Sequence, residues 1–266
     1  MRRAPVSATL LCALGSLVMS GCTAPPSRVP TATQASFSEG RSILAELRRH
    51  SPHGAFVENV RVTMREPRTG RTIQARGAVA VEPRRAMRLV LLGPGGATAL
   101  DVWVTRDAWR FAVPALDLVR HSKDNDNDGD DDRAAGFPIG FFRWWFLEPL
   151  DGKLLTAFDL PLSPEERSYA TALHYLVIRK DESTIGLKIA DTPRGRVYFA
   201  TRRTPGKRMV DHLRWASHAF SPGPGSGASY IQSVTGIRVD IEIESISPDE
   251  PDPAAFLDPD HGGQAL

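Results

Sequence analysis

Ile237 to Glu244, with the sequence IRVDIEIE, alternates apolar and charged residues without interruption. Successive side chains of a β-strand point to opposite faces of a sheet. The stretch therefore predicts a strand with one buried face and one solvated face, as antiparallel sheets commonly have. The apolar face consists of Ile237, Val239, Ile241 and Ile243.

The same two-residue period recurs along most of the chain and predicts further strands. In the first half these are residues 56–65, 73–81, 87–92, 100–105 and 109–113. In the second half they are residues 169–179, 184–189, 196–202 and 209–215. With turn signals between them, we expect about ten or eleven mostly sequential strands. The expected fold is mostly β (α+β): a single large curved antiparallel sheet forming a half-barrel, with a few helices covering its concave face.

Two segments break the strand pattern and predict those helices. Ser36 and Glu39 have the spacing of a capping box, and an apolar stripe follows, so we expect an amphipathic helix over residues 36–49. Residues 137–150, FPIGFFRWWFLEPL, are bulky and apolar on every side. Such a helix is buried or contacts something apolar. The segment is either a plug for the core or a lid over an acyl-binding cavity, with Phe142 and Trp145 as candidate lipid contacts.

The N-terminus predicts a lipid anchor. Residues 1–21 combine a basic start with an apolar stretch that is too short to cross a bilayer as a helix, which is typical of a signal peptide. The run Val18–Cys22 resembles a lipobox, so we expect Cys22 to be acylated and to become the first residue of the mature chain. The alternatives are an ordinary secretory signal with a chance cysteine and, less favoured, an uncleaved membrane helix. An Asp directly after the acylated cysteine retains lipoproteins in the inner membrane. Because this position is Thr23, we expect the outer membrane as the destination.

The domain organisation follows from composition. Residues 22–35 are the acylated cysteine and a flexible linker rich in Pro, Ser, Thr and Ala. We expect one half-barrel domain over 36–260, interrupted by an acidic loop at 122–135, and a short tail at 261–266. Without residues 1–21, the chain has 31 basic and 31 acidic residues and no dense basic patch, which argues against nucleic-acid binding. It would retain no disulfide and no cysteine nucleophile.

The acidic loop has the strongest resemblance to a metal site. Carboxylates at alternate positions followed by Gly129 suit a Ca²⁺ loop, although an EF-hand is excluded because Ala135 stands where a Glu is required. The candidate ligands are Asp124, Asp126, Asp128 and Asp132. A solvated acidic loop without bound metal is the favoured interpretation.

No catalytic motif is evident in the sequence. The seven histidines are scattered; His212 and His218 flank Trp215 but lack metal-ligand spacing with an acidic residue. The run GPGSG at 223–227 lacks the Gly two residues before Ser226 that a G-x-S-x-G motif requires. We therefore expect no cofactor and no enzymatic activity.

The order of elements points to a known family. A capped helix comes first, followed by a strand ending in GAVAV at 77–81 and by the strand and turn MRLVLLGPGGATAL at 87–100. The segment FRWWFL at 142–147 and the alternating strand at 237–244 come later. Together they resemble the LolB-like outer-membrane lipoproteins, which are related to the LolA carrier, over about residues 36–247.

The resemblance implies both a fold and an activity. The fold would be an eleven-stranded half-barrel closed by helices around an apolar cavity. The activity would be to accept acyl chains of lipoproteins from a LolA-like periplasmic carrier and to deliver them to the outer membrane, without chemistry. Two features depart from the family pattern. The turn Gly93–Gly96 lacks the apolar residue that the family exposes there, and the acidic loop is foreign to it.

The expected protein is thus an outer-membrane-anchored periplasmic lipoprotein, held to membrane lipid through Cys22, that binds acyl chains and helps localise lipoproteins or lipids. The main alternative is a non-transferring structural or partner-binding envelope lipoprotein with the same fold. A Ca²⁺-responsive surface protein is a further alternative, and an envelope hydrolase is disfavoured by the missing motifs. An acyl-binder would leave a void beside the inward-facing residues, which a structural module would fill. By alternation, these residues are Leu89, Leu91, Leu100, Val102, Val104, Ile237, Val239, Ile241 and Ile243.

Overall fold

The computed structural model describes residues 31–67, 69–122, 133–134, 137–147, 150–180, 182–203, 209–216, 227–233, 235–247 and 249–260. The predicted signal peptide, the acylated Cys22 and the tail at 261–266 lie outside the described residues. So do the four candidate Ca²⁺ ligands, Asp124, Asp126, Asp128 and Asp132. These features therefore stay predictions.

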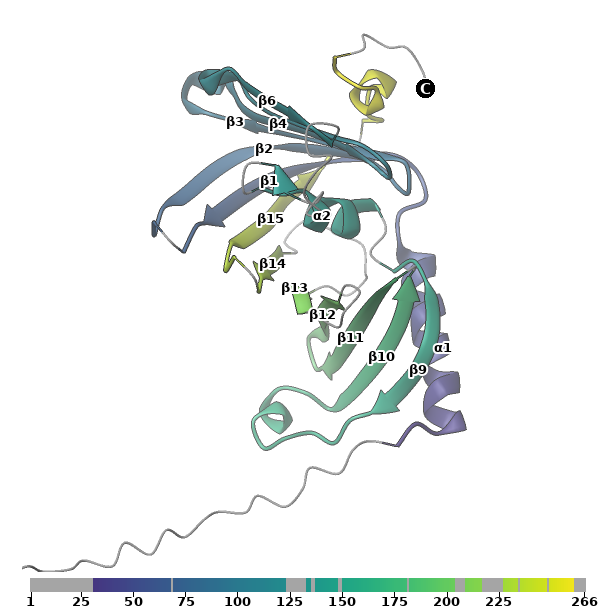
Figure 1. Ribbon diagram of the computed structural model, residues 1–266. Helices are drawn as coiled ribbons and strands as arrows, with labels where there is room; N and C mark the ends of the chain where they lie inside the picture. Colours follow the sequence, from purple (N-terminus) through teal and green to yellow (C-terminus); the bar gives the residue numbers. More distant parts are fainter. Residues whose placement is uncertain are drawn as a thin grey trace, which may run out of the picture.

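One open, curved antiparallel sheet of thirteen strands forms the molecule, which confirms the predicted mostly-β half-barrel (Figure 1). The strand order is β6-β5-β4-β3-β2-β1-β15-β14-β13-β12-β11-β10-β9. Two sequential meanders therefore meet where β1 pairs with β15. The first meander consists of β1 (Phe56–Arg65), β2 (Thr72–Glu82), β3 (Ala86–Leu92), β4 (Thr98–Thr105), β5 (Trp109–Val113) and β6 (Leu118–His121). The second consists of β9 (Lys153–Asp159), β10 (Ala172–Lys180), β11 (Ser183–Thr192), β12 (Gly195–Arg203), β13 (Met209–Ala216), β14 (Gly227–Gln232) and β15 (Arg238–Ile246).

The expected count of ten or eleven strands was too low, because β6, β9 and β14 carry weak local signals. β6 has four residues, and the sequence of β9, KLLTAFD, does not alternate strictly. β14, with the sequence GASYIQ, begins with Gly and Ala, which have low β-propensity. Hydrogen bonds to neighbouring strands stabilise these segments as strands despite their weak patterns. β14 lies between β13 and β15, and β9 pairs with β10 at the sheet edge.

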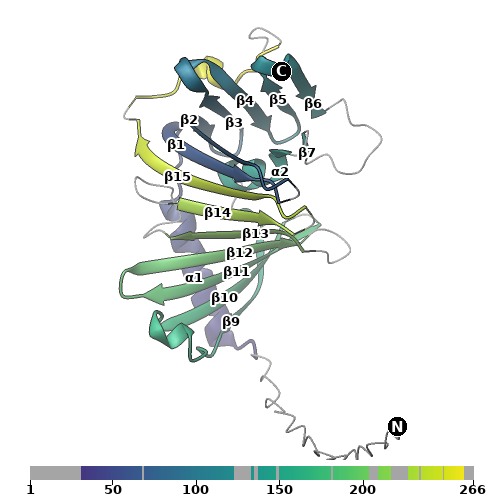
Figure 2. The same cartoon turned by 90° about the vertical axis from the view of Figure 1, so that its left-hand side faces the viewer.

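Helix α1 (Gln34–His50) lies along β9 and β10, and it begins earlier than predicted (Figures 1 and 2). Thr33, not Ser36, is its N-cap. The Thr33 hydroxyl accepts a hydrogen bond from the Ser36 amide at 3.0 Å, and Ser36 occupies the N3 position of the capping box. The predicted apolar stripe is confirmed, since Ile43, Leu44 and Leu47 are buried in the core.

The aromatic segment lies inside the curve of the sheet (Figure 1). It forms the short helix α2 (Ile139–Phe142), preceded by the short strand β8 (Phe137–Pro138), which pairs with β7 (Arg133–Ala134). One π-helical turn, Arg143–Leu147, continues α2. All of Ile139–Phe142 and Trp144–Leu147 is buried. We call residues 137–147 the aromatic plug. Among the described residues, no helix combines the length and the apolar character that a membrane crossing requires.

Candidate functional site: an apolar cavity at one end of the half-barrel

Several turns gather at one end of the sheet. The register pairs Arg65 with both Thr72 and Arg238, so the turn after β1 and the turn before β15 lie at the same end. The β3–β4 and β5–β6 turns also lie there, because the strands of this meander pair in sequence. A cavity of about 440 Å³ is present at this end, between the sheet and the aromatic plug.

The wall of the cavity is almost entirely apolar. Its residues come from β1 to β6 and the turns between them, from the first residue of the plug and from Ile237 before β15. Two of them, Glu66 and Arg71 in the β1–β2 turn, carry charge. The Glu66 carboxylate accepts a hydrogen bond from the Thr69 amide at 3.1 Å. The apolar residues are Val62, Met64, Ile73, Ala75, Leu91, Ala99, Leu100, Phe111, Val113, Leu116, Leu118, Phe137 and Ile237.

The inner wall of the cavity is aromatic. Phe137 lies 5.3 Å from Phe111 between ring centroids and stacks on Phe142 at 4.8 Å. Phe141 in turn stacks on Tyr230 of β14 at 4.0 Å. The plug is therefore packed between the two meanders, and a chain longer than the cavity would meet these stacked rings.

Two large apolar side chains of the cavity wall are also exposed to solvent. Ile73 at the start of β2 is 59% exposed, and Leu116 in the β5–β6 turn is 72% exposed. In the neighbouring turn, Gly95 and Gly96 have φ values of 77° and 80°, and no atom lies within 4 Å of a Cβ built on either. Leu92, the last residue of β3 before this turn, is also exposed, so apolar side chains are exposed beside the glycine turn as well as on either side of it.

The structure separates the predicted lipid-contacting residues into two groups. Leu91, Leu100 and Ile237 line the cavity. The others pack in the core: Leu89, Val102, Val104, Val239, Ile241 and Ile243 of the sheet, and Phe142 and Trp145 of the plug. Phe142 lies directly behind the cavity wall through its contact with Phe137. Lipid contact by any of these residues stays a prediction.

Sequence reasoning missed most of the cavity wall. Met64 and Phe111 stand at alternating apolar positions of predicted strands, so periodicity could have found them. Leu116 lies in a one-turn 3₁₀-helix, where no period marks it. Ala75 and Ala99 matter because they are small, and small residues leave space that the sequence pattern does not reveal.

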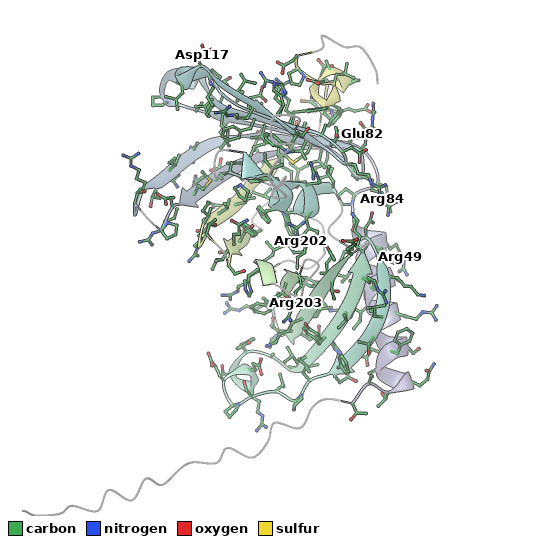
Figure 3. All side chains as sticks on the ribbon, viewed as in Figure 1. Arg49, Glu82, Arg84, Asp117, Arg202 and Arg203 are labelled. Carbon is green, nitrogen blue, oxygen red and sulfur yellow. The ribbon has the colours of Figure 1, made fainter. Side chains whose placement is uncertain are left out.

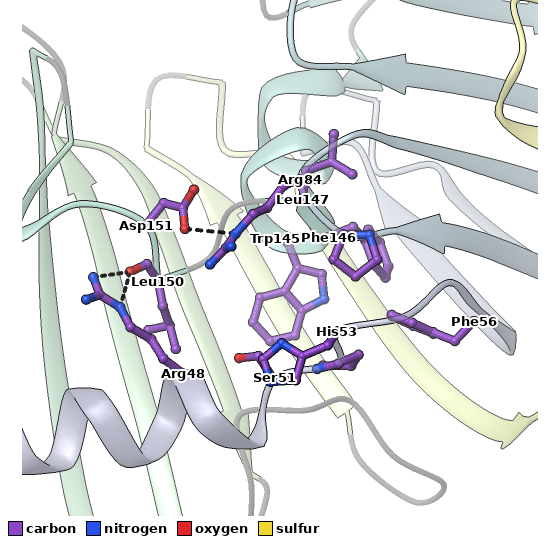
Figure 4. A pocket seen from close by; sticks show the side chains of 12 residues that line it. Arg48, Ser51, His53, Phe56, Arg84, Trp145, Phe146, Leu147, Leu150 and Asp151 are labelled. Atoms are coloured by element: carbon purple, nitrogen blue, oxygen red, sulfur yellow. Dashed lines mark hydrogen bonds and ion pairs between the residues drawn. The ribbon is translucent and has the colours of Figure 1, made fainter.

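A second, smaller cavity of about 150 Å³ lies at the other end of β1 and β2 (Figure 4). Its walls are mixed: Arg48, His53, Arg84 and Asp151 face it together with Trp145, Phe146 and Leu147 of the plug. Arg84 and Asp151 form an ion pair at 3.7 Å across it. The plug thus separates an apolar cavity from one with both polar and apolar walls.

Polar groups hold the plug in place at several points. The Arg143 guanidinium donates to the Thr105 carbonyl at 3.0 Å, and the Arg84 amide donates to the Leu147 carbonyl at 3.2 Å. Arg202, labelled in Figure 3, extends from β12 over the Trp144 ring, with 5.7 Å between the guanidinium and the ring centroid. The plug is therefore tied to both meanders by contacts that an opening motion must break.

An ionisable side chain, that of Glu58, lies in the apolar interior. Glu58 of β1 is fully buried, and neither carboxyl oxygen has a hydrogen-bond partner within the described part of the chain. Burial raises the pKa of this carboxyl to about 8, because ionisation without water or a partner is costly. At neutral pH the Glu58 side chain is therefore largely uncharged.

Comparison with known proteins supports the fold. No protein-family model matches the sequence, and no curated protein matches it. A LolA superfamily protein from Nitrosomonas europaea superimposes with a TM-score of 0.53 over 82% of this chain and 97% of that chain, at 11% identity. A domain from Vibrio parahaemolyticus, provisionally named for outer membrane lipoprotein sorting, has a TM-score of 0.49 over 82% and 96% of the two chains, at 8% identity. The protein has a LolA-like fold, as the sequence resemblance predicted.

Proposed function

We propose that the protein is an outer-membrane-anchored periplasmic lipoprotein that binds an acyl chain in the apolar cavity and helps to localise lipoproteins or lipids. The cavity is the observation that carries this proposal. The cavity has an apolar wall and a volume of about 440 Å³. Replacing water with hydrocarbon in such a cavity is favourable, because apolar surface is removed from water. The LolA-like fold supports the same function.

The size of the cavity indicates how much lipid it holds. A dry protein cavity of about 150 Å³ accommodates benzene. The cavity here, about 440 Å³, is roughly three times larger, so it accommodates about one acyl chain. A ligand with several acyl chains needs more space than this, and the plug is the element that must move to provide it.

The proposed activity requires no catalytic group. A chain passes from a carrier to this protein if the receiving cavity binds it more strongly, so transfer rests on a difference in affinity. Ile73 and Leu116 combine exposure to solvent with contact with the cavity, and we assign the entrance to these two residues.

Native mass spectrometry tests acyl binding. The material is the chain from residue 22 onward with Cys22→Ser, challenged with a lysophospholipid and, separately, with a triacylated lipopeptide. We expect a one-to-one lysophospholipid adduct. Ala75→Trp places a large ring in the cavity and should abolish this adduct, because Ala75 lies in its wall.

Ala78→Trp is the matched control. Ala78 lies on the same strand but, by alternation, on the opposite face of the sheet. It should retain the adduct. The acyl-binding proposal would be contradicted if neither lipid formed an adduct. It would also be contradicted if Ala75→Trp and Ala78→Trp bound the lysophospholipid equally. That result would favour the structural or partner-binding alternative, which the dense packing of the plug also supports.

Membrane anchoring has a separate test. Acylation requires the Cys22 thiol, and two or more acyl chains give stable anchoring. Cys22→Ser should therefore move the exported protein from the outer-membrane fraction to the soluble periplasmic fraction. Unchanged fractionation of the variant would show that anchoring does not depend on Cys22.

A further inference from the structure

Three potential metal ligands from three elements meet beside the first half of α1. They are Glu39 of α1, Asp159 of β9 and His174 of β10, and one ligand atom of each lies within 4.8 Å of the others. Asp159 and His174 are direct partners across the β9–β10 ladder. Packing of α1 on both strands brings Glu39 to them. The sheet edge and the helix thus assemble a cluster that sequence spacing does not reveal.

The imidazole of His174 lies between two carboxylates. Its Nδ1 atom lies 2.9 Å from the Asp159 carboxylate, within the cluster. Its Nε2 atom lies 3.4 Å from the Asp191 carboxylate on the other side. Metal-binding histidines usually donate their second N–H to such a carboxylate, which fixes the tautomer with the ligating nitrogen free of hydrogen. Arg196 holds Asp191 in place with a 2.8 Å ion pair.

The charge balance of the cluster favours a cation. Glu39, Asp159 and Asp191 supply carboxylates, and Glu46 of α1 lies close by. The Arg196 guanidinium pairs with two of these carboxylates, those of Asp191 and Glu46. Within the described part of the chain, Glu39 has no ion pair, and the ion pair of Asp159 is with His174. Negative charge therefore exceeds positive charge here.

We propose that Glu39, Asp159 and His174 form a Zn²⁺ site that fastens α1 to the edge of the sheet. One imidazole nitrogen and two carboxylate oxygens suit Zn²⁺, whereas Ca²⁺ and Mg²⁺ prefer oxygen ligands alone. In a tetrahedral site the ligand atoms lie about 3.4 Å from one another. The His174–Asp159 hydrogen bond at 2.9 Å must therefore open slightly, and Glu39 must move to complete the site. The exposed side chain of Glu39 can make this movement. Water fills the fourth position.

The site would add to existing links along the same edge. The Ser36 hydroxyl donates to the Ala157 carbonyl at 3.2 Å, and Arg48 donates to the Gly152 carbonyl at 2.6 Å. Glu39 lies between these two helix positions. Bound Zn²⁺ would therefore hold the half of α1 that directly follows the linker, where the domain meets its tether.

Isothermal titration of the untagged chain from residue 22 onward, carrying Cys22→Ser, with ZnCl₂ tests the proposal. Ca²⁺ at about millimolar concentration is included to occupy the acidic stretch at 124–132. We expect one Zn²⁺ per chain, no comparable binding of Mg²⁺, and a rise of the Tm with Zn²⁺. His174→Ala should lose the binding. Asp191→Asn should weaken it about tenfold, because a partner of a metal ligand is removed.

Two further variants separate metal binding from folding. Glu39→Gln removes a ligand from the exposed surface of α1 and should lose both the binding and the Zn²⁺-dependent rise of the Tm. His121→Ala is the matched control, because His121 also faces a carboxylate, Asp260 at 3.4 Å, which Arg110 holds at 2.8 Å. The proposal would be overturned if the unsubstituted chain did not bind Zn²⁺. It would also be overturned if Glu39→Gln and His174→Ala both bound Zn²⁺ as the unsubstituted chain does.

Discussion

At the scale of single residues, Glu58 sets a pH dependence of stability. An ordinary glutamate ionises with a pKa of 4.5, whereas burial raises the pKa of Glu58 to about 8. Between these pH values the unfolded chain has released a proton that the folded chain retains. The free energy of unfolding therefore falls as the pH rises from 4.5 to about 8 and then levels off. By pH 7 the loss is about 3 kcal/mol, at about 1.4 kcal/mol for each pKa unit.

Glu58→Gln should remove this slope, because an amide does not ionise in this range. The measurement is the free energy of unfolding in urea at pH 5 and at pH 8 for both proteins. The change in this free energy between the two pH values is then compared. Glu82→Gln, at a solvent-accessible position of the neighbouring strand, is the control and should leave the slope unchanged. An identical pH difference in Glu58→Gln and the unsubstituted protein would refute the assignment.

At the scale of elements, α1 packs closely against β9 at Gly40. A Cβ on Gly40 would lie 2.4 Å from the Cβ of Ala157, which is closer than real side chains approach. Helix propensity alone favours alanine over glycine by about 1 kcal/mol. We nevertheless expect Gly40→Ala to destabilise the protein by about 1–3 kcal/mol, because the extra methyl group overpacks the contact.

Equilibrium unfolding in urea measures this effect, and Ser38→Ala on the exposed side of the same helix is the control. Equal or greater stability of Gly40→Ala would show that α1 shifts away from β9 at little cost. From the sequence, Gly40 is merely a residue of low helix propensity. The structure shows that its missing side chain allows α1 to approach β9 closely.

The aromatic plug is the element that should respond to ligand size. Phe137 stacks on Phe142, which contacts Phe141 edge-on, and these rings lie between the cavity and the second meander. A triacylated lipopeptide should displace them and speed amide hydrogen exchange in residues 137–147. A lysophospholipid, which fits the existing cavity, should leave this exchange unchanged. Hydrogen exchange followed by mass spectrometry measures both, and the β10–β11 hairpin serves as the internal reference. Equal protection of residues 137–147 with both lipids would show that the plug is fixed.

At the scale of the whole molecule, the two proposed sites occupy different halves of the sheet. The cavity wall comes from β1 to β6, from Phe137 and from Ile237 beside β15, whereas the proposed metal site belongs to α1, β9 and β10. They share no residue. Effects of substitutions at distant sites without common partners are usually additive. Ala75→Trp should therefore leave Zn²⁺ affinity unchanged, and Glu39→Gln should leave lysophospholipid binding unchanged. A changed affinity in either cross-test would show that the plug couples the two halves.

The period of each segment is enough to predict the class of the fold and which surfaces are apolar. Strict alternation over Ile237–Glu244 fixes which side chains are buried, and the stripe of Ile43, Leu44 and Leu47 fixes the buried face of α1. The burial of residues 137–147 follows from their apolar character on every side. These properties are local, because each depends on the period of one segment.

Which strands pair and where a cavity remains depend on contacts between segments that are distant in sequence. The pairing of β1 with β15, the addition of β9 to β10 and the insertion of β14 each depend on a partner elsewhere in the chain. Leu89 and Leu91 share one periodic pattern, yet of these two residues it is Leu91 that lines the cavity. The position of a void depends on how several elements pack, which the period of one strand does not show. Glu39, Asp159 and His174 are far apart in sequence, and the contact of α1 with the sheet edge brings them together.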